Sequence, residues 1–446
     1  MLCSMTSSTK HPFPQPERLT IAGGVPLYVL RSDGHEAVRI DIVVSAGQWE
    51  QDRMLQSLFT NRMLREGTLD HTASQFAEQL DRYGAWLELS VSGHHSFITL
   101  YTLRRYARET CSLLAEMLFH PIFPDDRLST VKANNKSQYL VSSCRGDVMA
   151  RRMLYRSLYG PDHPCARFAI EGHFDAICRD DIVRYYQTFY RPEGLTIYLS
   201  GHIDDAIVSS IDATFTSAIQ AQSNVAGSLP VCSTFDGVSD YINLSTGRPS
   251  VASPLPDISI APKERVLIHH QPGAVQTSLC MGGLMMDVNS DDYCAMRVVS
   301  ALLGGYFGSR LMRSIREEKG LTYSISTDLL TNTHQVLFTV VSECQADEGE
   351  AVAHEVRSEC ERLCSDLVPE EELTLVRNYM EGEMLRNYEG VFALADAAIY
   401  MHTLCLHPDH LERSLHTVRS IDVHTVRDTA RRWLHADNLV VALVMP

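Results

Sequence analysis

The segments VRYYQTFYRPEGLTIYLSG (Val183–Gly201) and VRDTARRWLHADNLVVALVMP (Val426–Pro446) decide the fold of this chain of 446 residues. In each segment, a helix-like stretch passes through a short turn into an apolar strand, which begins at Leu195 in one and at Leu439 in the other. These two leucines lie 244 positions apart. The same unit closes both halves of the chain, which indicates an internal duplication.

The two halves also open alike. The strand-like segments VRIDIVVSAG (Val38–Gly47) and VQTSLCMGGL (Val275–Leu284) begin 237 positions apart. Helix-like stretches, a pair of strands and several long helices follow in each half. Because strands and helices are grouped rather than alternating, we predict an α+β protein and not a doubly wound fold. Each of its two homologous domains has a mostly antiparallel sheet with helices packed on one face.

A stretch rich in Ser, Pro and Gly, from Ala221 to Pro262, reads as a linker. We therefore expect an N-terminal domain over residues 15–220, a linker over 221–262 and a C-terminal domain over 263–446. We expect these two domains to touch little apart from the linker, which would permit hinge motion.

Composition excludes several classes of protein. Lys and Arg number 39 against 55 Asp and Glu, and the net charge of −16 argues against a nucleic-acid binder. The sequence contains no run of about 18 apolar residues, so we expect no membrane span. Its N-terminus lacks the pattern of a secretory signal. The 12 cysteines include no C-x-x-C pair. We expect reduced thiols and a cytoplasmic protein.

The motif with the most specific chemistry is LLGGYFGSRLMRSIREEKGLTYSIS (Leu302–Ser326). A Gly-Gly turn leads into a short helix that contains Arg316, Gly320 ends this helix, and a strand begins at Tyr323. Arg316 and Tyr323 can face one cavity and donate hydrogen bonds to a peptide carbonyl or a developing oxyanion. The alternative is a helix–strand corner with a surface arginine and a half-buried tyrosine.

This motif, the duplicated halves and the segment FYRPEGLTIYLSGHID together resemble the pitrilysin/insulinase metallopeptidases, the group that contains mitochondrial processing peptidase. The resemblance covers the chain from about Leu19 to Pro446. It implies two domains that close like a clam around a chamber. It also implies that Arg316 and Tyr323 bind substrate opposite a zinc ion.

The positions at which the family has its zinc ligands carry different residues in this sequence. The register of NRMLREGT places the family's inverted His-x-x-Glu-His motif on Leu58, Asn61 and Arg62, and its third ligand, a Glu, on Gln138. Leucine has no lone pair and arginine is a permanent cation, while zinc requires about three thiolate, imidazole or carboxylate ligands. Asn61 cannot act as the general base. The resemblance therefore implies a subunit without zinc or any other cofactor of its own.

Two further segments bear on this interpretation. The family binds peptide along an edge strand near the zinc, and AWLELSVSG places Glu88 and Leu89 there. Main-chain hydrogen bonds can form whatever the side chains are. The histidines and the cysteine of MHTLCLHPDH could form a metal site, but Pro408 favours an incidental cluster at a helix end.

Two functions stay open at this point. In the first, the chain is a catalytically incomplete homologue that pairs with a zinc-bearing homologous subunit, or with itself, and contributes binding of a peptide substrate. In the second, it is a scaffold or peptide-binding protein without a role in proteolysis. A self-sufficient zinc peptidase would require every ligand assignment above to be wrong.

Overall fold

The computed structural model describes residues 13–21, 24–34, 36–226, 264–331 and 335–446, together with the short strands β7 (Ile242–Asn243) and β8 (Arg248–Pro249). Helix α8 (Asp205–Ala226) runs through the first residues of the predicted linker, and most of the remaining linker lies outside the described residues. None of the described helices is both long enough and apolar enough to cross a membrane.

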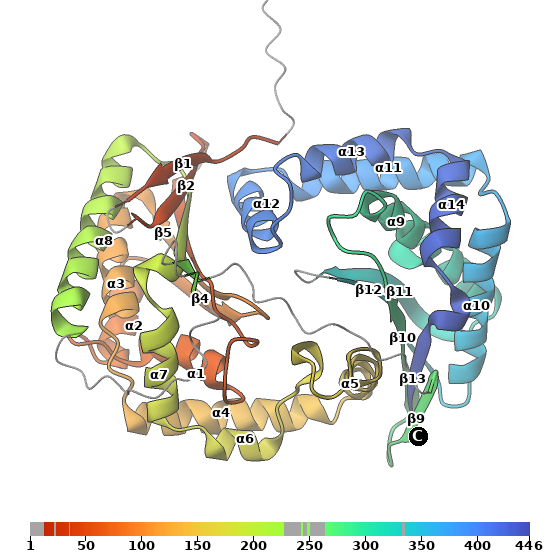
Figure 1. Ribbon diagram of the computed structural model, residues 1–446, viewed down its shortest axis with the longest axis horizontal. Coiled ribbons are helices and arrows are strands. Elements are labelled where there is room, and N and C mark those ends of the chain that lie inside the picture. The colour runs from red at the N-terminus through yellow and green to blue at the C-terminus, as the bar shows by residue number, and fades with distance from the viewer. Residues whose placement is uncertain are drawn as a thin grey trace, which may run out of the picture.

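Two sheets organise the chain (Figure 1). The first has the strand order β1 (Glu17–Thr20), β2 (Pro26–Arg31), β6 (Leu195–Gly201), β3 (Ala37–Val44), β5 (Ser96–Leu103), β4 (Trp86–Val91). The second has the order β9 (Val266–His270), β13 (Val440–Met445), β10 (Gln276–Leu284), β12 (Val336–Gln345), β11 (Thr322–Thr331).

The second sheet repeats the first apart from β1. The β2–β6 and β9–β13 pairs are parallel, and every other pair in the two sheets is antiparallel. The predicted α+β class is therefore confirmed, with two sheets that are mostly antiparallel, and the shared strand order agrees with the duplication.

Helices surround each sheet on the outer side of the molecule (Figure 1). The helices of the first half, besides α8, are α1 (Gln56–Met63), α2 (Ala73–Arg82), α3 (Ala107–Phe119), α4 (Asp125–Ser143), α5 (Gly146–Tyr159), α6 (Glu171–Ala176) and α7 (Arg179–Phe189). Those of the second are α9 (Tyr293–Ser300), the π-helical turns η7 (Ala301–Gly305) and η8 (Met312–Glu318), α10 (Gly349–Ser365), α11 (Glu370–Asn387), α12 (Val391–Thr403), α13 (His410–Ser420) and α14 (Val423–Trp433).

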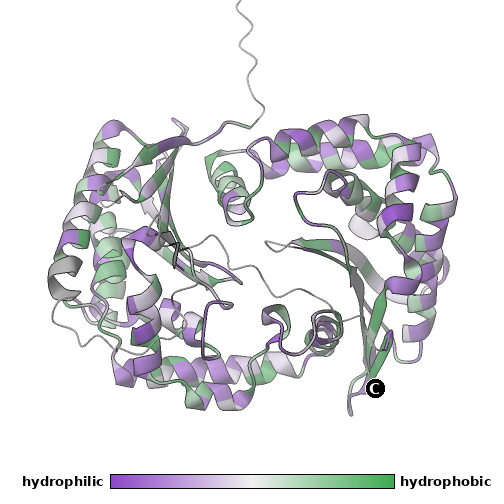
Figure 2. Ribbon diagram, in the orientation of Figure 1, coloured by the Kyte–Doolittle hydropathy of each residue, from purple (hydrophilic) through white to green (hydrophobic). Residues whose placement is uncertain are grey.

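Each half sends one helix to the opposite sheet. Helix α5 packs on β10 and β13, where Leu154 and Leu158 join Cys280 and Ala442 in one apolar cluster. Helix α12 packs on β2 and β6 in the same way. Figure 2 shows hydrophobic residues along β10 and β13 and on α12. All seven residues of β6 are buried because helices cover both faces of that strand.

The expectation that the halves touch little is therefore wrong. Besides these apolar clusters, the Arg39 guanidinium on β3 lies 2.7 Å from Asp41 and 2.5 Å from Asp396 of α12. The Tyr198 hydroxyl lies 2.7 Å from His402 Nδ1. Sequence periodicity reports that a helix has an apolar face, but it does not report which sheet that face will meet.

Candidate functional site

The turn between η8 and β11 places Arg316 and Tyr323 near each other. Gly320 ends η8 with φ +68, in the left-handed region that glycine adopts without strain. The chain then enters β11 at Thr322. The preceding turn η7 lies directly on β11, because a Cβ on Gly304 would lie 2.5 Å from Thr327 Cγ2. The two glycines thus allow the helix–strand corner to close.

The guanidinium of Arg316 contacts two aromatic rings. Its Cζ is 5.0 Å from the ring centroid of Tyr323 and 5.0 Å from that of Phe307. Both rings are open to solvent, at 81% exposure for Tyr323 and 67% for Phe307. Rings on a guanidinium restrain its plane but leave its N–H edge free. Among the described residues, no ion pair or hydrogen bond of the Arg316 side chain is found. The donors of Arg316 and the Tyr323 hydroxyl are therefore available to a ligand.

Phe307 is the part of this site that sequence reasoning missed. It belongs to the glycine-rich turn GGYFG, which the sequence suggests only as a flexible segment before the helix. An exposed aromatic residue among glycines was the available signal, because glycine-rich turns rarely need a large apolar side chain for their own packing.

Helix α1 carries the three positions to which the sequence resemblance assigns the family's zinc motif. Leu58 is half-buried and packs on the core of the first half. Asn61 is fully buried, and its amide nitrogen donates weakly to the carbonyl of Phe97 at 3.4 Å and to the Tyr190 hydroxyl at 3.5 Å. Arg62 is half-buried, and burial followed by the charge of Arg65 lowers the pKa of its guanidinium.

Gln138 lies on α4, which contacts α1, and its side chain is exposed. A leucine, two amides and a guanidinium offer none of the thiolate, imidazole or carboxylate groups that hold a catalytic zinc. In the described part of the chain, no three His, Cys, Asp or Glu side chains are grouped so that they could hold a metal ion. The residues at this position do not fit zinc.

The edge strand next to α1 is β4, and within the described ranges it pairs only with β5, along one of its two sides. Leu87 and Leu89 pack on the core, so Trp86 and Glu88 lie on the opposite face. The Trp86 indole donates to Glu88 at 2.9 Å, and Trp86 is 64% exposed. The free main-chain edge of β4 can still accept an added strand.

The histidines of the segment MHTLCLHPDH point to different partners. His402 contacts Tyr198 of the first sheet, His407 lies 2.5 Å from Asp409, and His410 is buried against the ring of Tyr293. The interpretation of this segment as an incidental cluster at a helix end agrees with these contacts.

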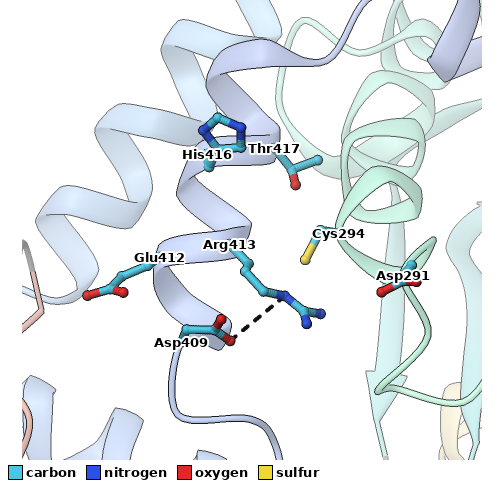
Figure 3. A pocket seen from close by; sticks show the side chains of 7 residues that line it. All are labelled: Asp291, Cys294, Asp409, Glu412, Arg413, His416 and Thr417. Carbon is cyan, nitrogen blue, oxygen red and sulfur yellow. Dashed lines mark ion pairs between the residues drawn. The ribbon is translucent and has the colours of Figure 1, made fainter.

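Two cavities lie away from Arg316, Tyr323 and the degenerate zinc positions. One of about 470 Å³ opens between α9 and α13 and is lined by Asp291, Asp409, Glu412 and Arg413, with Arg413 3.9 Å from Asp409 (Figure 3). The other, of about 1050 Å³, lies between α3 and α8. The first cavity includes Asp409 of the MHTLCLHPDH segment, and neither cavity includes Arg316, Tyr323, Leu58, Asn61, Arg62 or Gln138.

Comparisons with known proteins agree with this picture. Residues 176–380 match the family described as "Peptidase M16 inactive domain". A Bacillus subtilis protein named "Uncharacterized zinc protease YmxG" is 20% identical over 435 residues, which cover 96% of this chain and 98% of that protein. A Helicobacter pylori protein named "Non-peptidase homolog YmxG" is 26% identical over 275 residues, 61% of this chain and 56% of that protein.

A solved structure shares the fold. The crystal structure of a peptidase M16 inactive domain from Pseudomonas fluorescens has a TM-score of 0.81 and 21% identity, and the match covers 97% of this chain and 98% of that one. Residues 176–380 of this chain thus match the M16 inactive-domain family, and the chain is similar over nearly its whole length to relatives of that family, in line with the pitrilysin/insulinase resemblance of its motifs.

Proposed function

We propose that this chain is a zinc-less M16 subunit that pairs with a zinc-bearing homologous subunit and contributes Arg316 and Tyr323 to peptide hydrolysis. The observation that carries the proposal is a contrast within the chain. Arg316 is restrained by two rings with its donors free, whereas α1 offers no group that could bind zinc or act as a general base.

The contribution of this chain is hydrogen-bond donation. The guanidinium of Arg316 and the hydroxyl of Tyr323 would hold the carbonyl of the substrate and stabilise the negative charge that develops on its oxygen. Cleavage itself would depend on groups of the partner. A homodimer would place two degenerate α1 helices in the assembly and would lack a zinc site, so hydrolysis requires a different subunit.

The second candidate function is a scaffold or peptide-binding protein without proteolysis. The name of the Helicobacter pylori relative, a non-peptidase homolog, favours it. In that case Phe307, Arg316 and Tyr323 would form a stacked corner that shapes an interface. The two candidates differ in whether peptidase activity rises when a zinc-bearing homologue is added.

We further propose that the chain works in the cytoplasm and binds no nucleic acid. The net charge of −16 supports the second point. All ten cysteines in the described part of the chain are free thiols, which supports a reducing compartment.

The test is an Arg316→Ala variant mixed with the zinc-bearing homologue of the same organism. Loss of one preorganised donor should lower kcat/KM of the mixture by about 100-fold or more, without a change in the mass of the complex by light scattering. Arg313→Ala is the matched control, because Arg313 is an exposed arginine of the same turn. Full activity of the Arg316→Ala mixture would contradict the proposed role.

A further inference from the structure

Helix α1 presents one open stripe of side chains. From Gln56 to Arg65, every residue is buried except Leu58, Arg62 and Arg65. Spacings of four and three residues place these side chains on one face of the helix. Because α1 contacts both the edge strand β4 and helix α4, this stripe is the accessible surface of α1 beside β4.

Arg62 has no counter-charge in the described part of the chain. Burial and the charge of Arg65 are the influences on its guanidinium, and no acidic group opposes them. The lysines of α4 are already engaged, since Lys132 donates to the carbonyl of Ile177 and Lys136 pairs with Glu171 and Asp175.

The nearby carboxylates are also committed elsewhere. Glu66 accepts two hydrogen bonds from Arg127. Glu88 on β4 lies on the face of the sheet that points away from the core on which α1 packs. A half-buried cation without a partner, in a chain with net charge −16, is an unused anion-binding group.

We propose that Arg62 binds a carboxylate of an extended peptide that pairs with the free edge of β4. The inference rests on the proposed function, which gives a peptide as the ligand. It adds that this chain prefers peptides with a negative charge at one position. A guanidinium binds a carboxylate through two parallel hydrogen bonds. The position that holds an imidazole ligand in the zinc-bearing members of the family is here a receptor for a negative charge of the substrate.

The carboxylate can come from an Asp or Glu side chain or from the C-terminus of the peptide. The test uses fluorescein-labelled peptides of about eight residues, long enough to cover a strand of about six. The other residues of each peptide are Thr, Val and Ser. Each peptide carries a single Glu at one position, and its neutral counterpart carries Gln at the same position. Every peptide is made both with a free C-terminal carboxylate and as a C-terminal amide. Binding to the intact chain alone is measured by fluorescence anisotropy.

We expect a peptide with its carboxylate at one particular position to bind roughly tenfold more tightly than the same peptide without that charge. If the source is a side chain, changing Glu to Gln at one position removes the preference, and if it is the C-terminus, amidation does. Arg62→Gln should abolish the preference, whereas Arg65→Gln, one turn further along the stripe, should keep it. An equal affinity for charged and neutral peptides, an absence of binding, or loss of the preference in both variants would each overturn the proposal.

Arg62→Lys guards against a folding defect, because it keeps the charge without the planar fork and should retain part of the preference. These measurements need no zinc-bearing partner and leave Arg316 intact. They can therefore fail while the Arg316→Ala mixture behaves as expected, or succeed while it does not, so the two proposals are tested separately.

Discussion

At the residue scale, three arginines differ in what surrounds their guanidinium groups. Arg39 is buried between Asp41 and Asp396, and its ion pair with Asp396 joins the two halves. The guanidinium of Arg316 contacts the faces of two aromatic rings, and Arg62 lies half-buried with no acidic partner among the described residues. An arginine whose donors are already satisfied is structural, whereas one that is restrained but unsatisfied can bind a ligand.

The stacking partner of Arg316 makes a prediction of its own. Phe307→Leu keeps an apolar side chain of similar reach but removes the π-system, so the guanidinium loses one of its two restraints. We expect kcat/KM of the mixed complex to fall about two- to fivefold, the equivalent of an exposed cation–π contact.

The matched control for this variant is Phe307→Tyr, which keeps the ring and should behave as the unmodified chain does. Assays of both variants with the same peptide and partner decide the point. An equal loss in the two variants would mean that the ring of Phe307 does not position Arg316.

At the element scale, the corner between η8 and β11 depends on one backbone conformation. Gly320 has φ +68, and a Cβ placed on it would meet nothing within 4 Å. The cost of a side chain there is therefore backbone strain alone and not a clash.

We expect Gly320→Ala to lower the free energy of unfolding by about 1 kcal/mol and to reduce the activity of the mixed complex, because it shifts Tyr323 relative to Arg316. Gly382→Ala in α11 is the control. That site is also open, but it is helical without positive φ, so alanine should be neutral or stabilise the chain by up to about 1 kcal/mol. Chemical denaturation compares the two, and an equal effect at both sites would contradict this account of the corner.

The same corner shows what sequence can and cannot predict. The break at Gly320 and the strand that follows were readable, because glycine and β-branched residues carry local signals. The start of the first helix was harder to read. The stretch QDRMLQSLFTNRMLREG (residues 51–67) has a helical pattern, but α1 covers only Gln56–Met63, with Leu55 in the left-handed region before it. The contact of Phe307 with Arg316 depends on how a turn folds back, which no local pattern encodes.

At the scale of the whole molecule, the exchange of α5 and α12 makes the two halves one packing unit. The strand order of each half follows from its own sequence, but the exchange depends on contacts between residues more than 100 positions apart, such as Leu154 with Cys280 and Tyr198 with His402. Such contacts have no periodic signal, which is why weakly associated halves were the natural expectation from sequence.

One buried and two half-buried histidines make the stability of the molecule dependent on pH. Burial lowers the pKa of His410 to about 4 and that of His95 to about 3, and it also lowers the pKa of His402. The unfolded chain protonates these residues near pH 6.5, whereas the folded chain does not. Below about pH 6.5 the unfolded state therefore binds more protons, and stability is lost as the pH falls toward about 4.

We expect the free energy of unfolding to fall between about pH 6.5 and about pH 4, by up to about 1.4 kcal/mol per pH unit for each such histidine. His410→Gln should flatten this slope. His416→Gln, an exposed position on the same helix, should leave it unchanged. Denaturation at several pH values measures the slopes, and identical slopes in all three proteins would show that His410 does not titrate as described.

The central claim is that this chain lacks zinc and supplies donors to a subunit that has it. The most direct measurement is the zinc content of the purified chain together with its cleavage of a quenched peptide library, alone and with its zinc-bearing homologue. We predict no stoichiometric zinc and no cleavage alone, with a rate on mixing above that of the homologue. Stoichiometric zinc with cleavage by the isolated chain would contradict the assignment of Leu58, Asn61, Arg62 and Gln138 as a degenerate site.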